Sequence, residues 1–211
     1  LVGSEMCIRD SVVTGGEVGG GAKSTLTQLY DGTTFSTSPA TPATGRMSGT
    51  AAGTSSAGQI ISGSPSGTLT EEFTISLTET TGAAWASGGN MNTPRAENFG
   101  VSGTIPAAVA FGGYTPGSPN ATANSEEYNG TSWTEGHNLG TARWDISGAG
   151  TQTAALHFGG IGVTPPHAGV DQALTEEYNG SSWTETGDLN QAGYQMGDYG
   201  TQTAAGAVGR I

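Results

Sequence analysis

Three arginines and three glutamate pairs are the residues of this sequence best suited to binding or acid–base chemistry. The arginines occur at one repeated position: Arg46, Arg95 and Arg143. The glutamate pairs share another: Glu71-Glu72, Glu126-Glu127 and Glu176-Glu177. Neighbouring residues of a β-strand point to opposite faces, so such a pair cannot act as acid and base on one substrate. We expect the pairs to lie on a solvated strand edge that discourages aggregation.

Metal-binding and catalytic patterns are not found in this sequence. His137, His157 and His167 lack metal-ligand spacing, and Cys7 is the single cysteine, which also excludes an intrachain disulfide. No serine stands in a Gly-x-Ser-x-Gly setting with a plausible His and Asp. The sequence therefore predicts no catalytic residue, no metal site, no cofactor and no enzymatic activity.

Charge excludes two classes of partner. The net charge is −12, the pI is near 4.3, and the six Lys and Arg residues are scattered along the chain. Binding of a nucleic-acid backbone or an anionic membrane needs clustered basic residues, so we expect neither partner. The sequence contains no run of about 18 apolar residues, so it predicts no membrane-spanning helix.

Internal repeats dominate the sequence. The segment 126–135 recurs as 176–185, and residues 126–160 are identical to residues 176–210 at 18 of 35 positions without a gap. Weaker copies precede these two. We therefore predict one array of about four repeats, near 12–56, 57–106, 107–153 and 154–211.

Each repeat is predicted to contain four short strands. In the last copies, an apolar strand at 154–158 ends at Gly159-Gly160, and strands at 174–178 and 182–184 flank Asn179-Gly180. That dipeptide predicts a type I′ hairpin turn, which needs positive φ at both central residues. The remaining strand is expected at 144–149. The fold class is therefore all-β, with four-stranded antiparallel units.

Together these features resemble the kelch repeat, in which an apolar strand ends in Gly-Gly, aromatic residues flank a hairpin turn, and a Leu or Met and then an Arg follow. The residues that carry the resemblance are Tyr30, Phe35, Trp85, Tyr128, Trp133, Tyr178, Trp183, Gly112, Gly113, Gly159 and Gly160. The resemblance implies β-propeller blades in an incomplete propeller. Two features depart from the family: Tyr128 and Trp133 are only five residues apart, and Gly193 replaces the expected Arg.

The resemblance also implies roles for particular side chains. The repeated aromatic residues would pack between adjacent blades. Arg46, Arg95 and Arg143 would line the mouth of a central cavity and bind an acidic ligand; alternatively, each arginine ties its loop to a neighbouring blade through carbonyl groups or a glutamate. Trp144 does not recur as Trp in other copies, which makes it a candidate for an exposed rim position and for binding a partner there.

The first ten residues fit neither the repeat nor a signal peptide. They resemble translated adapter sequence, so 1–10 is expected to be non-native and the chain a fragment. The remaining repeats resemble those of marine bacteriophage genomes, which are associated with tail and virion-surface proteins. That resemblance implies a virion-surface or extracellular location.

Function is predicted from the variable loops of the repeats. The segments 113–124 and 160–173 are the longest and least repetitive, and such insertions usually carry binding specificity. We expect a non-enzymatic binding or structural module with a protein or glycan partner. A propeller-based enzyme of oxidase or lyase type and a secreted carbohydrate-binding protein are the alternatives. The sequence leaves the oligomeric state open.

Overall fold

The computed structural model describes residues 11–18, 21–30, 33–46, 50–53, 57–61, 67–74, 84–96, 99–115, 121–164 and 168–209. These ranges contain strands, turns and irregular segments, and no helix lies within them, so none of the described residues forms a helix able to span a membrane. The adapter-like residues 1–10 lie outside the described ranges.

Three four-stranded antiparallel sheets form the centre of the fold. The second sheet contains β6 (Thr50–Gly53), β7 (Ala57–Ile61), β8 (Thr70–Thr74) and β9 (Ala84–Ser87). The third contains β10 (Gly100–Thr104), β11 (Ala107–Phe111), β12 (Ser125–Tyr128) and β13 (Trp133–Glu135). The fourth contains β15 (Ser147–Thr151), β16 (Ala154–Phe158), β19 (Thr175–Tyr178) and β20 (Trp183–Glu185).

Smaller sheets flank these three. The first sheet contains β1 (Ser11–Thr14), β4 (Thr27–Tyr30) and β5 (Phe35–Thr37), and the fifth contains β21 (Met196–Thr201) and β22 (Ala204–Gly209). Two hairpins project from connections between adjacent strands of a sheet. The hairpin of β2 (Glu17–Val18) and β3 (Ala22–Lys23) lies between β1 and β4. The hairpin of β17 (Ile161–Thr164) and β18 (Ala168–Asp171) lies between β16 and β19, and its strand β17 also pairs with β14 (Arg143–Trp144).

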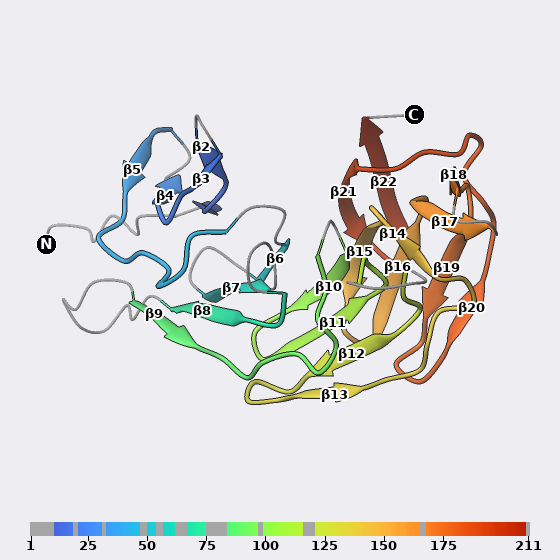
Figure 1. The fold of residues 1–211 in the computed structure, drawn as a ribbon, viewed down its shortest axis with the longest axis horizontal. Coiled ribbons are helices and arrows are strands. Elements are labelled where there is room, and N and C mark those ends of the chain that lie inside the picture. Colours follow the sequence, from blue (N-terminus) through green and yellow to red (C-terminus); the bar gives the residue numbers. More distant parts are fainter. Residues whose placement is uncertain are drawn as a thin grey trace, which may run out of the picture.

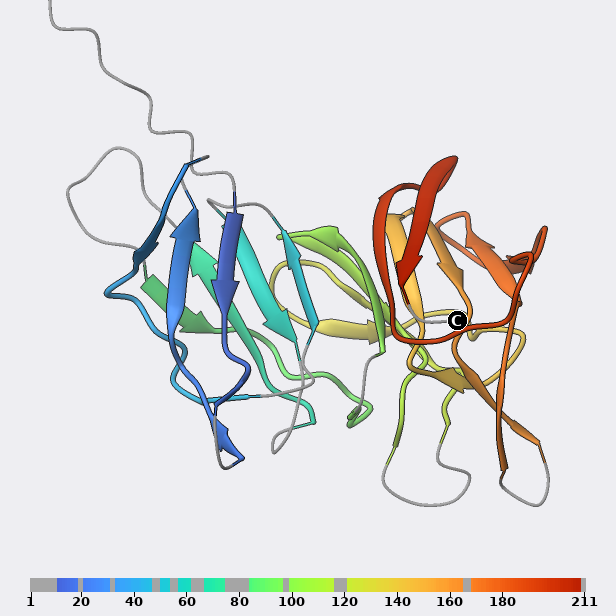
Figure 2. The ribbon, with the colours of Figure 1, turned by 90° about the horizontal axis from the view of Figure 1, so that it is seen from above.

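The five sheets are arranged as successive propeller blades. Their innermost strands β6, β10, β15 and β21 lie side by side in that order. The sheets follow an arc from the first sheet to the fifth, as Figure 1 shows. In the view from above, the blue and teal sheets lie on one side of the molecule and the orange and red sheets on the other (Figure 2). The fold is therefore all-β and built of antiparallel propeller blades, as the repeats predict.

The predicted strands agree with the structure except at one place. Strand β16 has the predicted bounds, and β19 and β20 differ from theirs by one residue. The strand expected at 144–149 is instead β15, at 147–151. Trp144 belongs to the separate strand β14, which pairs with β17. Each of the three four-stranded sheets thus begins with the strand that follows an arginine loop.

The predicted type I′ turn is wrong. Gly130 has a φ of 91°, but Asn129 is not among the residues with positive φ. The Asn129 side chain instead accepts hydrogen bonds from the amides of Thr131 and Ser132, both at 3.0 Å. Asn129 therefore acts through its side-chain oxygen, which satisfies two turn amides without a left-handed backbone.

The repeated aromatic side chains have different environments along the arc. Trp133 is buried in a cluster with Ile61, Met91 and Tyr128, between the second and third sheets. Trp183 packs on Phe111 of the third sheet, at a ring-centroid distance of 4.8 Å. These two tryptophans lie between blades, as the resemblance implies.

The first sheet departs from that pattern. Phe35 is 57% exposed, so the expectation that it packs between blades is wrong in this structure. Its ring lies against that of Tyr30, its partner on β4, at a centroid distance of 4.8 Å. No earlier sheet lies against it in the described part of the chain. Trp85 lies on β9, but its side chain is outside the described features.

A tyrosine and a glutamate connect neighbouring sheets. The hydroxyl of Tyr128 on the third sheet donates to Glu72 on the second, at 2.6 Å. Tyr178 on the fourth sheet donates in the same way to Glu127 on the third. Burial, followed by the hydrogen bond to Glu72, raises the pKa of Tyr128 to about 12. The second glutamate of the first two pairs, Glu72 and Glu127, therefore accepts a bond from the next blade.

At the interface between the first and second sheets, both the tyrosine and the glutamate are replaced. Strand registers place Leu29 at the position of Glu72, and Phe73 at the position of Tyr128. Both side chains are buried. An apolar pair therefore occupies the place of a hydroxyl–carboxylate pair, and neither position retains a polar group that needs the other.

This correspondence predicts a non-additive pair of substitutions. Tyr128→Phe removes a hydrogen bond to a carboxylate and should lower the free energy of unfolding by about 1.5–3 kcal/mol. Adding Glu72→Leu to that variant should recover most of the loss, because it creates the pair found at Leu29 and Phe73. Urea unfolding of both single variants and the double variant measures the coupling; losses that simply add would contradict it.

Candidate functional site

Arg143 joins the loop after the third sheet to the interior of the fourth. Its Nη1 donates to the carbonyl oxygens of Gly159, at 2.8 Å, and Leu174, at 2.7 Å. Its Nη2 donates to Oε1 of Glu176 at 2.7 Å. The arginine therefore binds the ends of two strands and a carboxylate on β19, all within the next blade.

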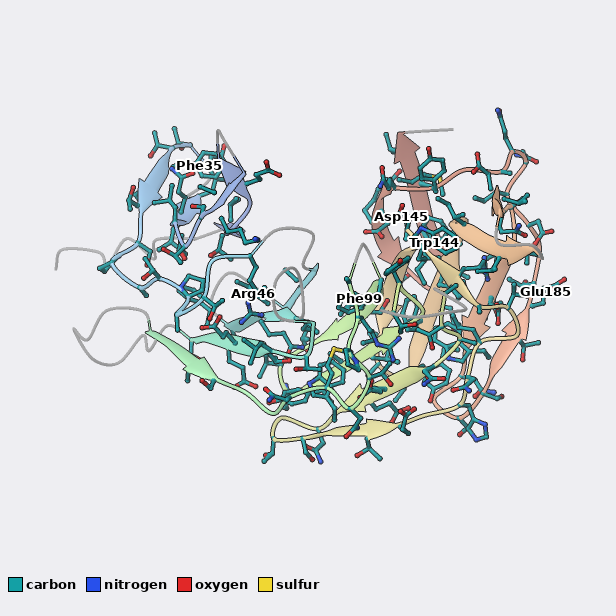
Figure 3. The ribbon with its side chains drawn as sticks, in the orientation of Figure 1. Phe35, Arg46, Phe99, Trp144, Asp145 and Glu185 are labelled. Carbon is teal, nitrogen blue, oxygen red and sulfur yellow. The ribbon has the colours of Figure 1, made fainter. Side chains whose placement is uncertain are left out.

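Arg95 and Arg46 make equivalent contacts in the two preceding interfaces. Arg95 donates to the carbonyl oxygens of Gly112 and Asn124 and to Glu126; Arg46 donates to the carbonyl oxygen of Leu69 and to Glu71. Figure 3 labels Arg46, which lies among the strands of the second sheet. A buried arginine–glutamate pair thus recurs in three successive blades.

The predicted arginine binding site is corrected by these contacts. Arg46, Arg95 and Arg143 are 3%, 0% and 0% exposed, so their guanidinium groups do not face an open cavity. Burial is possible because carbonyl and carboxylate oxygens receive the charged donors. The alternative interpretation, in which each arginine ties its loop to the adjacent blade, describes the observed geometry.

The first glutamate of each pair is equally internal, so its predicted place on a solvated edge is wrong. The Glu126 carboxylate accepts the amides of Asn92 and Thr93, at 2.7 and 3.0 Å, and Glu176 accepts the amide of Gly140 at 2.8 Å. Glu71 accepts the amide of Ala43 at 2.7 Å. Each carboxylate therefore fixes the backbone of the loop that delivers its arginine.

His157 adds a titratable group to the pair in the fourth sheet. Arg143 Nη2 lies 2.7 Å from His157 Nε2, and an arginine can only donate, so the neutral ring carries its proton on Nδ1. Burial, together with the Arg143 charge, lowers the pKa of His157 to about 4, although a hydrogen bond to Glu176 opposes the shift. His157 is therefore neutral at physiological pH.

Glu176 stays charged beside it. Burial alone would raise its pKa, but a hydrogen bond from His157 in its protonated form, together with hydrogen bonds from the Gly140 amide and Arg143, lowers it to about 2. Because His157 is neutral above pH 4, Arg143 and the amide stabilise the carboxylate at neutral pH. The cluster is a structural ion pair with no substrate access.

The paired glycines position the same loops. Gly112, Gly113, Gly159 and Gly160 all have positive φ. The amide of Gly113 donates to the Arg143 carbonyl oxygen at 2.8 Å, and a Cβ on Gly112 would lie 2.8 Å from that oxygen. Only glycine accommodates both the backbone conformation and the close approach.

Trp144 lies on β14, between the third and fourth sheets in the chain and next to the β17–β18 hairpin. It is half-buried, and its ring is edge-on to Tyr114 at a centroid distance of 6.3 Å. A Cβ on Gly169 of β18 would lie 3.2 Å from the indole. Val170 on the same strand is 44% exposed. The indole, labelled in Figure 3, is thus part of a surface formed by residues outside the repeat.

The β17–β18 hairpin was missed in the sequence analysis, which treated 160–173 as a variable loop. The alternation of Ile161 and Val163 was the available signal, but the prolines that follow favoured a loop. Pro165 and Pro166 lie outside the described residues, as do Pro116 and Pro119 of the other predicted loop.

A groove of about 240 Å³ runs along the innermost strands. It is lined by Ala51, Val101, Ser102, Gly103, Gly148, Ala149, Gly150, Asp198, Tyr199 and Gly200. Asp198 accepts the amide of Gly148 at 2.6 Å, and burial raises the pKa of this carboxylate despite that bond. Within the described ranges, no three His, Cys, Asp or Glu side chains gather as metal ligands. The groove wall is mainly backbone and small side chains.

Comparison with known proteins supports the architecture. No family model matches the chain, and no curated protein matches it. Among solved structures, the chain is similar to the structure of YjhT, with a TM-score of 0.72 and 11% sequence identity. The match covers 94% of this chain and 73% of that one. At this identity the likeness shows the fold alone.

The buried ion pair predicts a large effect of removing one partner. Arg143→Leu leaves Glu176 charged and desolvated, so the free energy of unfolding should fall by about 3–5 kcal/mol. Arg143→Leu combined with Glu176→Leu should lose much less, because no charge remains buried. Urea unfolding measures both, with Glu185→Gln on the exposed end of β20 as a control that should change little. A double variant less stable than Arg143→Leu alone would contradict the pairing.

His157 predicts a pH dependence with a defined sign. Its folded pKa, about 4, lies below the ordinary 6.5, so the unfolded chain binds more protons between these values. The free energy of unfolding should therefore fall by up to about 3 kcal/mol as the pH drops from 6.5 to 4. His157→Gln keeps an acceptor for Arg143 and should reduce this loss. Equal pH dependence of the two proteins between pH 6.5 and 5 would exclude the mechanism.

Proposed function

We propose that this chain is a non-enzymatic binding module of kelch-like type, whose repeated charged residues hold the blades together. Its partner, a protein or a glycan, binds the surface around Trp144. The observation that carries the proposal is that the repeated charged residues and the non-repeated aromatic residues lie in different places. The repeated arginines and the first glutamate of each pair are internal, whereas the non-repeated Trp144 and Tyr114 meet beside a projecting hairpin.

An enzyme on this scaffold would need several ionisable groups converging at one end of the blades. Asp198 and Tyr199 are the titratable residues that line the groove in the described part of the chain. The remaining lining offers mainly backbone groups and small side chains, which favours binding over lyase or oxidase chemistry. The same surface serves the alternative of a secreted carbohydrate-binding protein.

The nature of the surface favours a ring-shaped or apolar ligand group over a strongly anionic one. Trp144 and Tyr114 offer aromatic area, and binding sites commonly combine such area with a few polar groups. The net charge of −12 disfavours nucleic acid and anionic membrane surfaces. We propose an extracellular or virion-surface location, on the resemblance of the repeats.

Immobilised glycans test the proposal with two matched variants. If a sugar stacks on the indole, Trp144→Ala should weaken binding at least tenfold, which corresponds to about 1.4 kcal/mol. Tyr199→Ala is the control, because Tyr199 is an exposed aromatic residue in the groove and not at the hairpin surface. Loss of binding in Tyr199→Ala alone would place the site in the groove. Binding unchanged by Trp144→Ala would reject the Trp144 surface.

A further inference from the structure

A cavity lies between the fourth sheet and β22. At the two preceding interfaces the corresponding space is filled by Trp133 and Trp183. This cavity, the open slot, has a volume of about 150 Å³. It is lined by Leu156, Phe158, Thr175, Gly187, Asp188, Leu189, Ala205, Gly206 and Ala207. The last three belong to β22, and the others to the fourth sheet and the loop after β20.

The residues that surround Trp183 in the preceding interface occupy the corresponding positions. Trp183 packs on a cluster that includes Val109, Phe111, Leu139 and Ala155. Strand register and the sequence repeat identify their counterparts in the following repeat. These are Leu156, Phe158, Leu189 and Ala205, and all four line the open slot. The slot therefore has the lining of a tryptophan site.

Hydrogen-bonding groups recur in the same way. The indole of Trp133 donates to Thr70 at 3.2 Å, and that of Trp183 donates to Ser125 at 3.4 Å. Thr175 stands at the corresponding position of the fourth sheet and lines the open slot. Its hydroxyl is thus placed to receive an indole N–H.

Glu177 supplies a second matching group. Glu72 and Glu127 each accept a tyrosine hydroxyl from the following sheet. Glu177 occupies the equivalent position on β19 and is exposed. A tyrosine of an added strand would reach this carboxylate.

The fifth sheet is docked in the register that such an addition requires. Gln202, in the β21–β22 turn, donates to the carbonyl oxygens of Ala155 and Tyr178. Gln152 makes the same two contacts one sheet earlier, to Ala108 and Tyr128. Strand β22 pairs only with β21 in the described structure, whereas its counterpart β16 also pairs with β19. Its outer edge is therefore available for strand addition.

We propose that the open slot and the edge of β22 bind a β-hairpin of the repeat's own type, with a strand ending in Tyr, an Asn-Gly turn and a strand beginning with Trp. The hairpin pairs with β22, its tryptophan fills the slot, and its tyrosine donates to Glu177. This inference concerns a surface separate from Trp144, so it does not depend on the proposed function.

The residues around the open slot also predict one residue of the hairpin that binds there. In the fourth sheet, Glu176 faces His157 across the strand pair and is neutralised by Arg143. For the fifth sheet these positions are occupied by Ala207 and Gly193, neither of which can pair with a carboxylate. The hairpin should therefore carry an uncharged residue at the position of Glu176.

A fluorescent peptide with the sequence of residues 174–186 tests the proposal against the intact chain. It should bind saturably, and the peptide carrying Glu176→Gln should bind at least tenfold more tightly. The peptide carrying Trp183→Ala should bind at least tenfold more weakly than its parent. On the protein, Ala205→Phe fills the slot and should abolish binding, Glu177→Gln should weaken it, and Trp144→Ala should leave it unchanged.

The exposed positions of Ala205 and Glu177 make these protein variants suitable, and circular dichroism confirms that each one folds. Peptide binding that ignores the slot substitutions, or no saturable binding of any peptide, would overturn the proposal. Concentration-dependent self-association that is lost in Ala205→Phe but not competed by the peptide would also overturn it. That result would assign the slot to a second copy of the chain.

Discussion

The buried contact between an arginine and the next blade is the constraint on which the rest of the arc depends. Each guanidinium brings together a loop, the end of one strand and a carboxylate on another, and the backbones of Arg46 and Arg143 are in turn bound by a paired glycine. The Arg95 side chain bonds to Gly112, and Gly113 bonds to the Arg143 backbone. The Arg143 side chain then bonds to Gly159. A desolvated charge with this many fixed partners leaves little freedom in how one sheet follows the next.

The blades were predictable from the sequence because their determinants are local. An apolar run that ends at two glycines, as at 154–160, shows a buried strand and its end within a few residues. The charged partners were not predictable in this way. Arg46, Arg95 and Arg143 are separated from their glutamates by 25, 31 and 33 residues, because the connection between the second and third strands varies in length. A fixed spacing, the signal that a single sequence offers, does not exist for such a pair.

The same limit explains the errors on the glutamates and the turn. Glu126 looks like an exposed strand residue when only its neighbours are considered, since its arginine comes from the preceding loop. Asn129-Gly130 suits a type I′ turn by composition, yet the Asn129 side chain bonds to the turn amides more favourably than its backbone could in a left-handed conformation. The Trp144 surface was only half predictable, because the indole was recognised by its failure to repeat and the hairpin beside it was not.

Differences among the interfaces show which attachments can be exchanged. At the first interface the hydroxyl–carboxylate pair is replaced on both sides, by Leu29 and Phe73, so no polar group is buried alone. At the fifth sheet the arginine is replaced by Gly193, while the Gln202 contacts and the bond from Gly160 to the Gly193 carbonyl remain. Bonds to the backbone are therefore kept at this sheet, where the arginine is absent. The arginine additionally requires a glutamate on the third strand of the sheet that it contacts. Where the arginine is absent, as at Gly193, the third strand should carry an uncharged residue at that position.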